Sequence, residues 1–451
     1  TNTNGLIEAL ANSEVQLTTN VSITGGILST TGNGVIRELD GQNVFLTDLT
    51  NAGAILVNNN ASLHTSGTIT NSGSITLNSS GNNTDLHLSA NTILTGSGTV
   101  TLAANNNNRI TADSLLSLTN VNNLIQGFGQ IGVNAITIDN QGTIDANVMS
   151  QTLTIDPANV ANAFVNEANG LVRASNGGIL LLSGSGSGSF DNRGTLAATT
   201  GGALQFTGTV TSSGTVDVGN NSLSISGNGN FTQTAGTFRL AGGTFTSSNG
   251  LSFNGGLIDA RGTINSAITN SALLRPALGG SGLNVTGSVS LLSASQLSFQ
   301  LGGLTQGSQY GFLNVNGTVA LGGQLVLSFA NGFQNSVTGS DTFTLMTTNG
   351  LNGSFTNIAS GDRLQTSDGF GSFLVTYNGT TLSLSNFILG SGPTVVTATW
   401  LHPADGNWTT ATNWSSNPNF PNNGTPSNTL YDAVIDATGA PYTVTLANAV
   451  T

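Results

Sequence analysis

The acidic side chains are the residues of this chain that could serve as general acids, bases or nucleophiles. Glycoside hydrolysis, for example, needs two carboxyl groups about 5–10 Å apart. The candidates are Asp139 and Asp145, which flank one Gly-Thr-Ile phrase, and Asp191, which lies close to Arg193. Their spacing brings no set of acids together, and most lie beside turn residues, where Asp accepts hydrogen bonds from backbone amides. We therefore expect structural roles for these acids and predict no catalytic residue.

Histidine and aspartate are also the residues that could bind a metal ion or a cofactor. His64 and His87 are spaced to lie above one another in a repeating fold, but a metal site needs a third ligand, and only scattered Asp residues are near in sequence. Asp362 and Asp368 lack the Asp-x-Asp-x-Asp order of a calcium loop. The run 183–189 alternates Ser and Gly, and glycine-rich runs occur in phosphate-binding loops, yet no Lys follows it. We predict stacked surface histidines, turn-forming aspartates, no metal and no cofactor.

Tryptophan side chains gather near the end of the chain, at Trp400, Trp408 and Trp414. An exposed platform of indoles could stack on sugar rings, which would make this segment a carbohydrate-binding module. The alternative is that the indoles form the core of a small domain or a contact between chains, and we favour it because the segment has few other bulky residues. The residues predicted to contact another subunit are Trp400, Trp408, Trp414, Tyr442, Val444 and Leu446.

A recurring phrase of glycine, threonine and an apolar residue indicates how these side chains are positioned. Each copy combines a turn glycine with a short strand whose β-branched Thr and apolar neighbour point to opposite sides. The better copies are spaced by about 20–26 residues, which is the period of a stacked solenoid coil, so about 300 residues would form about fourteen coils. Insertions are expected at 103–130 and 155–169, where the spacing stretches. The copies are Gly67-Thr68-Ile69, Gly98-Thr99-Val100, Gly142-Thr143-Ile144, Gly194-Thr195-Leu196, Gly214-Thr215-Val216, Gly236-Thr237-Phe238 and Gly262-Thr263-Ile264.

Composition restricts the class of protein and its partners. Only 6% of the residues are charged, no Cys is present, and all eight basic residues are Arg. The net charge of -12 disfavours nucleic acid and anionic membranes as partners, and no run of 18 apolar residues could span a bilayer. The polar surface must therefore consist of Asn, Ser, Thr and Gly, which suit tight turns and ladders of identical side chains. We expect an extracellular or cell-surface protein of bacterial type, without membrane insertion.

Changes in composition divide the chain into four segments. Residues 1–304 are predicted to form an all-β parallel β-solenoid, or β-helix. Residues 305–389 have longer strands and are expected to form a β-sandwich-like capping module that hides the last coil. Residues 390–398 form a Gly/Ser/Pro hinge, and residues 399–451 form a small Trp/Pro-rich β unit with a strand that could join the next subunit or repeat.

Two of these segments resemble known proteins. The phrases Leu313-Asn314-Val315-Asn316-Gly317-Thr318, Asp341-Thr342-Phe343-Thr344-Leu345 and Thr380-Thr381-Leu382-Ser383-Leu384 resemble the module that ends β-helical stretches in large bacterial surface proteins, including autotransporter-like passengers and adhesins. The Trp-rich segment, with Gly406-Asn407-Trp408 and Thr412-Asn413-Trp414, resembles the unit that opens a fresh β-helix in the same proteins. The resemblance implies a cap that is followed by the start of another solenoid.

Together, these features favour a structural rather than a catalytic function. The chain starts within repeat-like sequence and ends where a new repeat starts, so we expect a non-enzymatic subunit of a bacterial extracellular fibre or surface filament. Such subunits would join head to tail with copies of themselves or continue in a tandem array; a trimmed fragment without assembly meaning is the plain alternative. Two other functions stay open. One is an adhesin or glycan-binding passenger that recognises cell-surface or matrix glycans from a solenoid stalk, and the other, more distant, is a polysaccharide-degrading β-helix enzyme.

Overall fold

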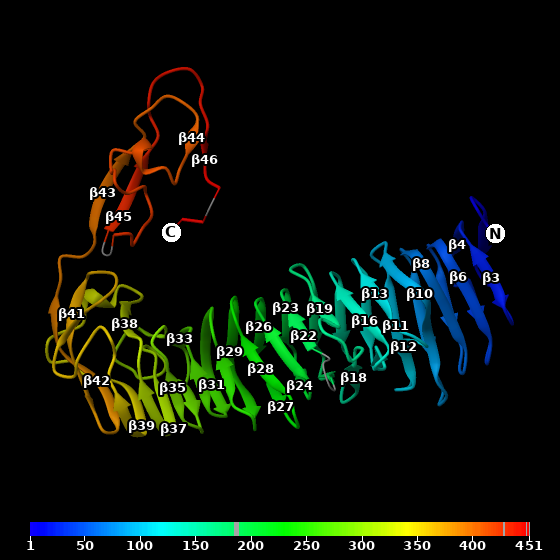
Figure 1. Ribbon diagram of the computed structural model, residues 1–451, viewed down its shortest axis with the longest axis horizontal. Helices are drawn as coiled ribbons and strands as arrows, with labels where there is room; N and C mark the ends of the chain where they lie inside the picture. Colours follow the sequence, from blue (N-terminus) through cyan, green and yellow to red (C-terminus); the bar gives the residue numbers. More distant parts are fainter. Residues whose placement is uncertain (185–188, 427–428, 448, 451) are drawn as a thin grey trace.

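The computed structural model describes residues 1–184, 189–426, 429–447 and 449–450. The protein is nearly all β, with 55% of its residues in strands and 1% in helices, and its main body is a parallel β-solenoid of about 13 turns. Figure 1 shows these turns stacked along the long axis, with the C-terminal unit turned away from the far end. The predicted parallel β-solenoid is thus confirmed. None of the helices in the described part of the chain has the length and apolar character that crossing a membrane requires.

Each coil contributes one strand to each of three parallel faces, which the chain visits in the order A, B, C. Face A contains β1 (Leu6–Ala9), β4 (Ile27–Thr30), the second halves of β6 (Asn43–Asn51), β8 (Ser62–Asn71) and β10 (Thr84–Thr95), then β13 (Leu116–Asn120), β16 (Ile136–Asn140), β19 (Phe164–Asn166), β22 (Ser189–Asn192), β25 (Thr209–Ser212), β28 (Asn230–Gln233), β30 (Leu251–Phe253), β32 (Ile268–Asn270), β35 (Val289–Leu291) and the second halves of β37 (Leu313–Leu321) and β39 (Phe343–Gly353).

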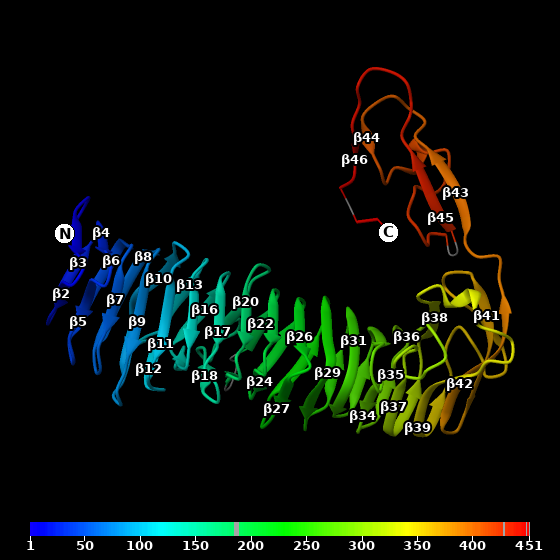
Figure 2. The same ribbon diagram turned by 180° about the vertical axis from the view of Figure 1, so that it is seen from behind.

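Face B contains β2 (Glu14–Leu17), β5 (Val35–Glu38), β7 (Ala54–Val57), β9 (Ser74–Asn78), β11 (Thr99–Ala103), β14 (Leu124–Gly127), β17 (Thr143–Ala146), β20 (Leu171–Ala174), β23 (Thr195–Ala198), β26 (Thr215–Gly219), the first halves of β29 (Thr237–Ser247) and β31 (Leu257–Asn265), β33 (Leu273–Pro276), β36 (Gln296–Leu301) and β38 (Gln324–Phe329). Face C contains β3 (Val21–Thr24), the first halves of β6, β8 and β10, then β12 (Asn108–Ala112), β15 (Gly129–Ile131), β18 (Thr152–Ile155), β21 (Ile179–Leu182), β24 (Ala203–Phe206), β27 (Ser222–Ile225), the second halves of β29 and β31, β34 (Leu283–Val285) and the first halves of β37 and β39. Figure 2 shows the same stack from behind.

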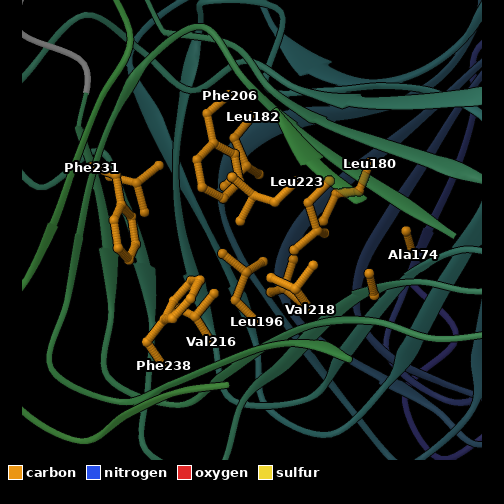
Figure 3. Packing of buried hydrophobic residues seen from close by; sticks show 14 of the residues in the cluster. Ala174, Leu180, Leu182, Leu196, Phe206, Val216, Val218, Leu223, Phe231 and Phe238 are labelled. Carbon is orange, nitrogen blue, oxygen red and sulfur yellow. The ribbon is translucent and has the colours of Figure 1, made fainter. Parts of the chain in front are cut away.

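Alternate side chains of the strands point inward and form one continuous apolar core from Ala9 to Phe387. Between β24 and β30 the core is aromatic. The ring of Phe231 lies 6.4 Å from that of Phe206 and 5.9 Å from that of Phe238, measured between centroids. Figure 3 shows these three rings directed into the same interior as the surrounding Leu and Val side chains. Burial of each such side chain stabilises the fold by about 1.5–3 kcal/mol.

The Gly-Thr-apolar phrase does not mark one face. Five of the seven copies open strands of face B, whereas Gly67-Thr68-Ile69 lies on face A and Gly262-Thr263-Ile264 on face C. On face B the glycine is required by close approach. A Cβ on Gly214 would lie 2.1 Å from the carbonyl oxygen of Gly194 in the previous coil, and that same oxygen accepts a hydrogen bond from the Thr215 amide at 2.8 Å. A side chain at this corner would therefore separate the two coils.

Asparagine side chains form a column inside the corner between faces A and B. The Asn140 amide donates to Asn166 Oδ1 at 2.8 Å and accepts from Asn120 Nδ2 at 2.9 Å. The next pair, from Asn166 to Asn192, is also 2.8 Å long, and Asn192 donates to Ser212 Oγ at 3.0 Å. All these side chains are buried. The predicted ladders of identical amides therefore exist, but they lie inside the solenoid rather than on its surface, because Asn120, Asn140 and Asn166 occupy the inward-facing last position of β13, β16 and β19.

Arginine side chains join neighbouring coils on the outside of the solenoid. Six of the eight arginines pair with a carboxylate of the preceding coil, at N–O distances of 2.7–3.0 Å. Exposed pairs of this kind contribute about 0–1 kcal/mol each. The pairs formed by Arg109 and Arg173 differ, because their carboxylates, Asp85 and Asp145, are buried. Two hydrogen bonds to Asp85 raise the pKa of the Arg109 guanidinium. The six pairs are Arg37–Glu14, Arg109–Asp85, Arg173–Asp145, Arg193–Glu167, Arg239–Asp217 and Arg275–Asp259.

One of the two expected insertions is absent. Residues 103–130 contain β12, β13 and β14, which pair with the coils before and after them, so the predicted insertion there is wrong. The coil lacks the Gly-Thr phrase, yet the inward-facing Leu118 and Ile125 of its strands still fit the interior between its neighbours. Within the second stretch, residues 156–163 form an irregular connection between β18 and β19.

Parallel pairing continues past residue 304, where the sequence suggested a boundary. Strands β36 to β39 still pair in parallel with the coils before them, as far as Gly353. The first antiparallel strand on the solenoid ladder is β42, which lies on β39 and pairs with β41, itself antiparallel to β40. The parallel ladder therefore ends at β39. The Phe373 ring lies 5.7 Å from that of Phe343 and 5.0 Å from that of Phe387, so these aromatic side chains pack together in the cap. Segment 305–389 is therefore solenoid in its first half and cap in its second, with η1 (Phe333–Asn335), β40 (Arg363–Gln365), β41 (Gly371–Asn378) and β42 (Thr381–Leu389).

Candidate functional site: the tryptophan-rich C-terminal unit

The C-terminal unit shares parallel strand pairing with the solenoid, but on two short two-stranded sheets rather than on three faces. Strand β43 (Thr394–Thr399) pairs in parallel with β45 (Thr429–Val434) over its whole length. Strand β44 (Gly406–Asn407) pairs in parallel with β46 (Val444–Thr445), and the short helix η2 (Ala411–Asn413) lies between β44 and β45 in the chain. Since the later strands stack on the earlier ones in the same order, the unit consists of two successive turns. Figures 1 and 2 show it joined to the cap by a single extended segment.

The three tryptophans form the core of this unit. The indole of Trp414 lies 5.0 Å from that of Trp400 and 4.8 Å from that of Trp408, both in edge-to-face geometry. Trp414 Nε1 donates to the carbonyl of Trp408 at 2.7 Å, and Trp408 Nε1 donates to the carbonyl of Pro421 at 2.8 Å. Trp400 and Trp414 are buried, whereas Trp408 is half-buried. A sugar-stacking platform would therefore have to use Trp408 alone.

The other predicted contact residues occupy two environments. Tyr442 and Val444 are half-buried and pack against the tryptophan core, whereas the Leu446 side chain is 53% exposed. The structure thus brings five of the six residues together within one unit. That these residues contact another subunit stays a prediction.

Exposed apolar side chains are concentrated around this unit. Fifteen large hydrophobic residues are exposed in the described part of the chain, and seven of them lie between residues 388 and 446. No Lys or Arg follows Arg363, so the only charged groups beyond the cap are acidic ones such as Asp405 and Asp432. A surface with many exposed apolar residues and few charges is typical of an interaction site. The seven residues are Ile388, Leu389, Val395, Leu401, Leu430, Ile435 and Leu446.

The histidines lie above one another on face C, as the sequence predicted, but they are not surface residues, because His87 is buried and His64 is half-buried. His64 and His87 are register partners in β8 and β10, and their ring centroids are 4.5 Å apart. The Phe45 ring stacks on the other side of His64 at 4.4 Å. Burial, and secondly the charge of His87, lower the pKa of His64. Within the described ranges no three His, Cys, Asp or Glu residues are arranged to hold a metal ion.

The acidic candidates are dispersed. Asp139 lies on β16 of face A and Asp145 on β17 of face B, where Asp145 pairs with Arg173 at 2.7 Å. Asp191 pairs with Arg193 at 2.8 Å. Asp145 and Asp191 therefore have arginine partners, whereas Asp139 accepts a hydrogen bond from Gln141 Nε2 at 3.2 Å through one carboxylate oxygen only. The absence of a catalytic residue stays a prediction.

The remaining residues considered as possible ligand-binding sites lie in loops. Asp368 accepts a hydrogen bond from the Phe329 amide at 2.6 Å and another from the Phe370 amide, so it supports a turn of the cap as the sequence suggested. The glycine-serine run 183–189 cannot be compared with its prediction, because residues 185–188 lie outside the described part of the chain.

Sequence reasoning overlooked one group, the carboxyl of Glu38, which is buried in the core. The signal was present in the alternation of β5, because Ile36 points inward and so must the residue two positions later. A search for charged residues at positions that the alternation directs inward would have identified Glu38.

A scan against models of protein families finds no match, and a search of the curated proteins finds none either. The strand pairing defines the class of this protein: it is a β-solenoid repeat protein with an antiparallel cap and a short C-terminal unit of parallel strand pairs.

Proposed function

We propose that this chain is a structural subunit of a bacterial extracellular fibre or surface filament, in which β-solenoid stacking continues from one unit to the next. The observation that carries the proposal is the parallel pairing of β43 with β45 and of β44 with β46. A cap that ended the molecule would need no further turns of this kind beyond it. The turns are what the start of another solenoid requires, since each coil buries its apolar face only against a neighbour.

The next coil would be supplied by a second copy or by a tandem repeat of the same chain. In a parallel ladder each strand pairs on both sides, and among the described residues β45 has a partner only in β43. Such an edge is a template for strand addition. Leu430 on β45 is 40% exposed and Leu446, just after β46, is 53% exposed, so an added coil would also bury apolar surface.

The first coil of the solenoid offers matching geometry. Strands β1, β2 and β3 run in the same three-face order, and Leu6 and Leu10 beside β1 are 58% and 57% exposed. Placing β1 beside β45 would keep all strands parallel and would continue the ladder without reversing its direction. The low charge and the absence of Cys also suit a protein whose strength comes from stacked coils rather than disulfides.

The proposal is tested by electron microscopy and sedimentation of the full chain and of two variants. The full chain is expected to form linear fibres with a constant axial repeat. Leu430→Asp places a charge on the proposed pairing edge and should weaken assembly at least tenfold. Leu304→Asp is the matched control, because Leu304 is 57% exposed on the solenoid body and should assemble normally.

Deletion of residues 393–451 separates the fold from the assembly. The truncated chain should keep its β-rich circular dichroism spectrum, because the core cluster of the solenoid and cap is separate from that of the C-terminal unit, and it should stay monomeric. Fibres of unchanged length from the truncated chain would contradict the proposal.

A further inference from the structure

Glu38 occupies a core position of face B. It is the last residue of β5, its register partners are Leu17 in β2 and Val57 in β7, and both of these side chains are buried. The Glu38 side chain itself is 0% exposed. Neither of its carboxyl oxygens has a hydrogen bond of ordinary geometry among the described residues, and the only polar group acting on them is the Val44 backbone amide. One acid thus interrupts an otherwise apolar column of the core.

An ionised carboxyl group is very costly in such a place, so it takes up a proton instead. Burial raises the pKa of Glu38 from its ordinary value of 4.5 to about 8, and the backbone of Val44 opposes this effect only in part. The folded N-terminal coils therefore hold a proton at neutral pH that the opened coils would release.

No charged side chain compensates for the acid. On β2, Glu14 pairs with Arg37 of β5 at 2.8 Å on the outer side of face B. Strand β7 carries no titratable residue, and Asp48 of β6 accepts a hydrogen bond from the Thr68 amide at 2.8 Å. Asp40, in the turn after β5, is exposed. The pKa of Glu38 is accordingly set by burial and by the backbone, without a contribution from a neighbouring charge.

We propose that Glu38 makes the first coils of the solenoid, β1 to β6, a pH-sensitive element that is closed when this carboxyl is protonated and opens when the proton is lost. Coils contact only their neighbours along the axis, so the first coils can open without unfolding the rest. The direction of the change in stability with pH follows from the linkage between proton binding and folding. A carboxyl whose pKa is raised in the folded state contributes full stability below pH 4.5, and this stability is lost progressively as the pH rises to about 8.

The consequence for assembly rests on the proposed function. If β1 accepts the edge strand of another unit, opening of the first coils removes that acceptor, and fibres should form at mildly acidic pH and weaken as the pH approaches 8. Regulation would then lie in the coil that receives the neighbour rather than in the C-terminal unit.

Hydrogen exchange measured by mass spectrometry on the unassembled full chain tests the switch independently of the fibre. Between pH 5 and pH 8, after correction for intrinsic exchange, protection of amides in β1 to β6 should fall on the order of a hundredfold. Amides in β24 to β27 serve as the internal reference and should not change. Glu38→Gln keeps the shape without an ionisable group, and Glu38→Leu restores the apolar column; both should remove the pH dependence.

The outcomes separate the two proposals. Equal pH profiles for the natural chain and either folded variant, or a fall of the same size in all coils, would overturn the role of Glu38. A normal exchange profile combined with fibres that are insensitive to pH would leave the switch in place and contradict its connection to assembly. If Glu38→Gln does not fold, Glu38→Leu alone decides, because it removes the titrating group and fills its volume.

Discussion

Substitution of Asn140 by Ala tests the idea that the buried asparagine column joins the coils. The Asn140 side chain donates to Asn166 Oδ1 and to the Gly142 carbonyl, and it accepts from Asn120 Nδ2. Alanine removes all three hydrogen bonds at a position that water does not reach, since Asn120 and Asn140 are 0% exposed and Asn166 is 1% exposed.

The size of the loss in stability follows from the polar groups that Asn140→Ala leaves without a partner. An N–H group of Asn120 loses its acceptor, and the oxygen of Asn166 loses its donor. A buried polar group without a partner costs about 1–3 kcal/mol, so the two together predict a loss of about 4 kcal/mol. Because coils interact only with their neighbours, this loss should fall on the coils that contain β13, β16 and β19.

Hydrogen exchange with peptide resolution is the suitable assay, because a long solenoid does not unfold in one step. Protection should fall by about three orders of magnitude in those three coils, since each 1.4 kcal/mol is a factor of ten. Asn228→Ala is the control, because Asn228 lies exposed in the turn between β27 and β28, and surface substitutions change stability by about 0.5 kcal/mol or less. The reasoning is refuted if Asn140→Ala costs less than about 1 kcal/mol or if protection falls equally along the whole rod.

Three other substitutions examine the remaining parts of the fold. Gly214→Ala places a Cβ 2.1 Å from the Gly194 carbonyl and should destabilise the neighbouring coils by about 1–3 kcal/mol, whereas Gly379→Ala, with no atom within 4 Å, should be neutral in a urea titration followed by circular dichroism. Phe231→Ala removes the centre of the aromatic core and should cost about 3–5 kcal/mol, with exchange rising first between β24 and β30; an unchanged profile there would show that the rings do not support one another. Trp414→Ala should unfold the C-terminal unit and leave the solenoid intact, so limited proteolysis should release residues beyond the cap while a rod-sized fragment survives.

The general architecture could be predicted from the sequence because it depends on local rules. Alternation of apolar and polar residues, a small residue at each corner and the near absence of Pro all indicate stacked short strands, and the histidine pair could be placed because His64 and His87 are separated by one coil. The tryptophan core followed from the scarcity of other bulky residues in its segment.

The other features depend on neighbours that a local pattern does not contain. Residues 103–130 were predicted as an insertion because the phrase is missing, yet a coil needs only to fit the coils on either side. Longer strands after residue 304 suggested a new module, whereas β37 and β39 are long because each turns a corner without a break. Glu38 was overlooked since a single acid in an alternating strand is normally a surface residue.

The hydrogen bonds of the asparagine column all run in the same direction along the solenoid. In each of its bonds, from Asn120 to Asn140 and onward to Asn166 and Asn192, the earlier coil donates and the later coil accepts. Reversing one amide would bring oxygen against oxygen on one side and N–H against N–H on the other, so the orientation of one member dictates that of the next. The interior thus holds a string of aligned dipoles parallel to the axis. Rods joined head to tail keep these dipoles aligned, whereas rods joined head to head oppose them.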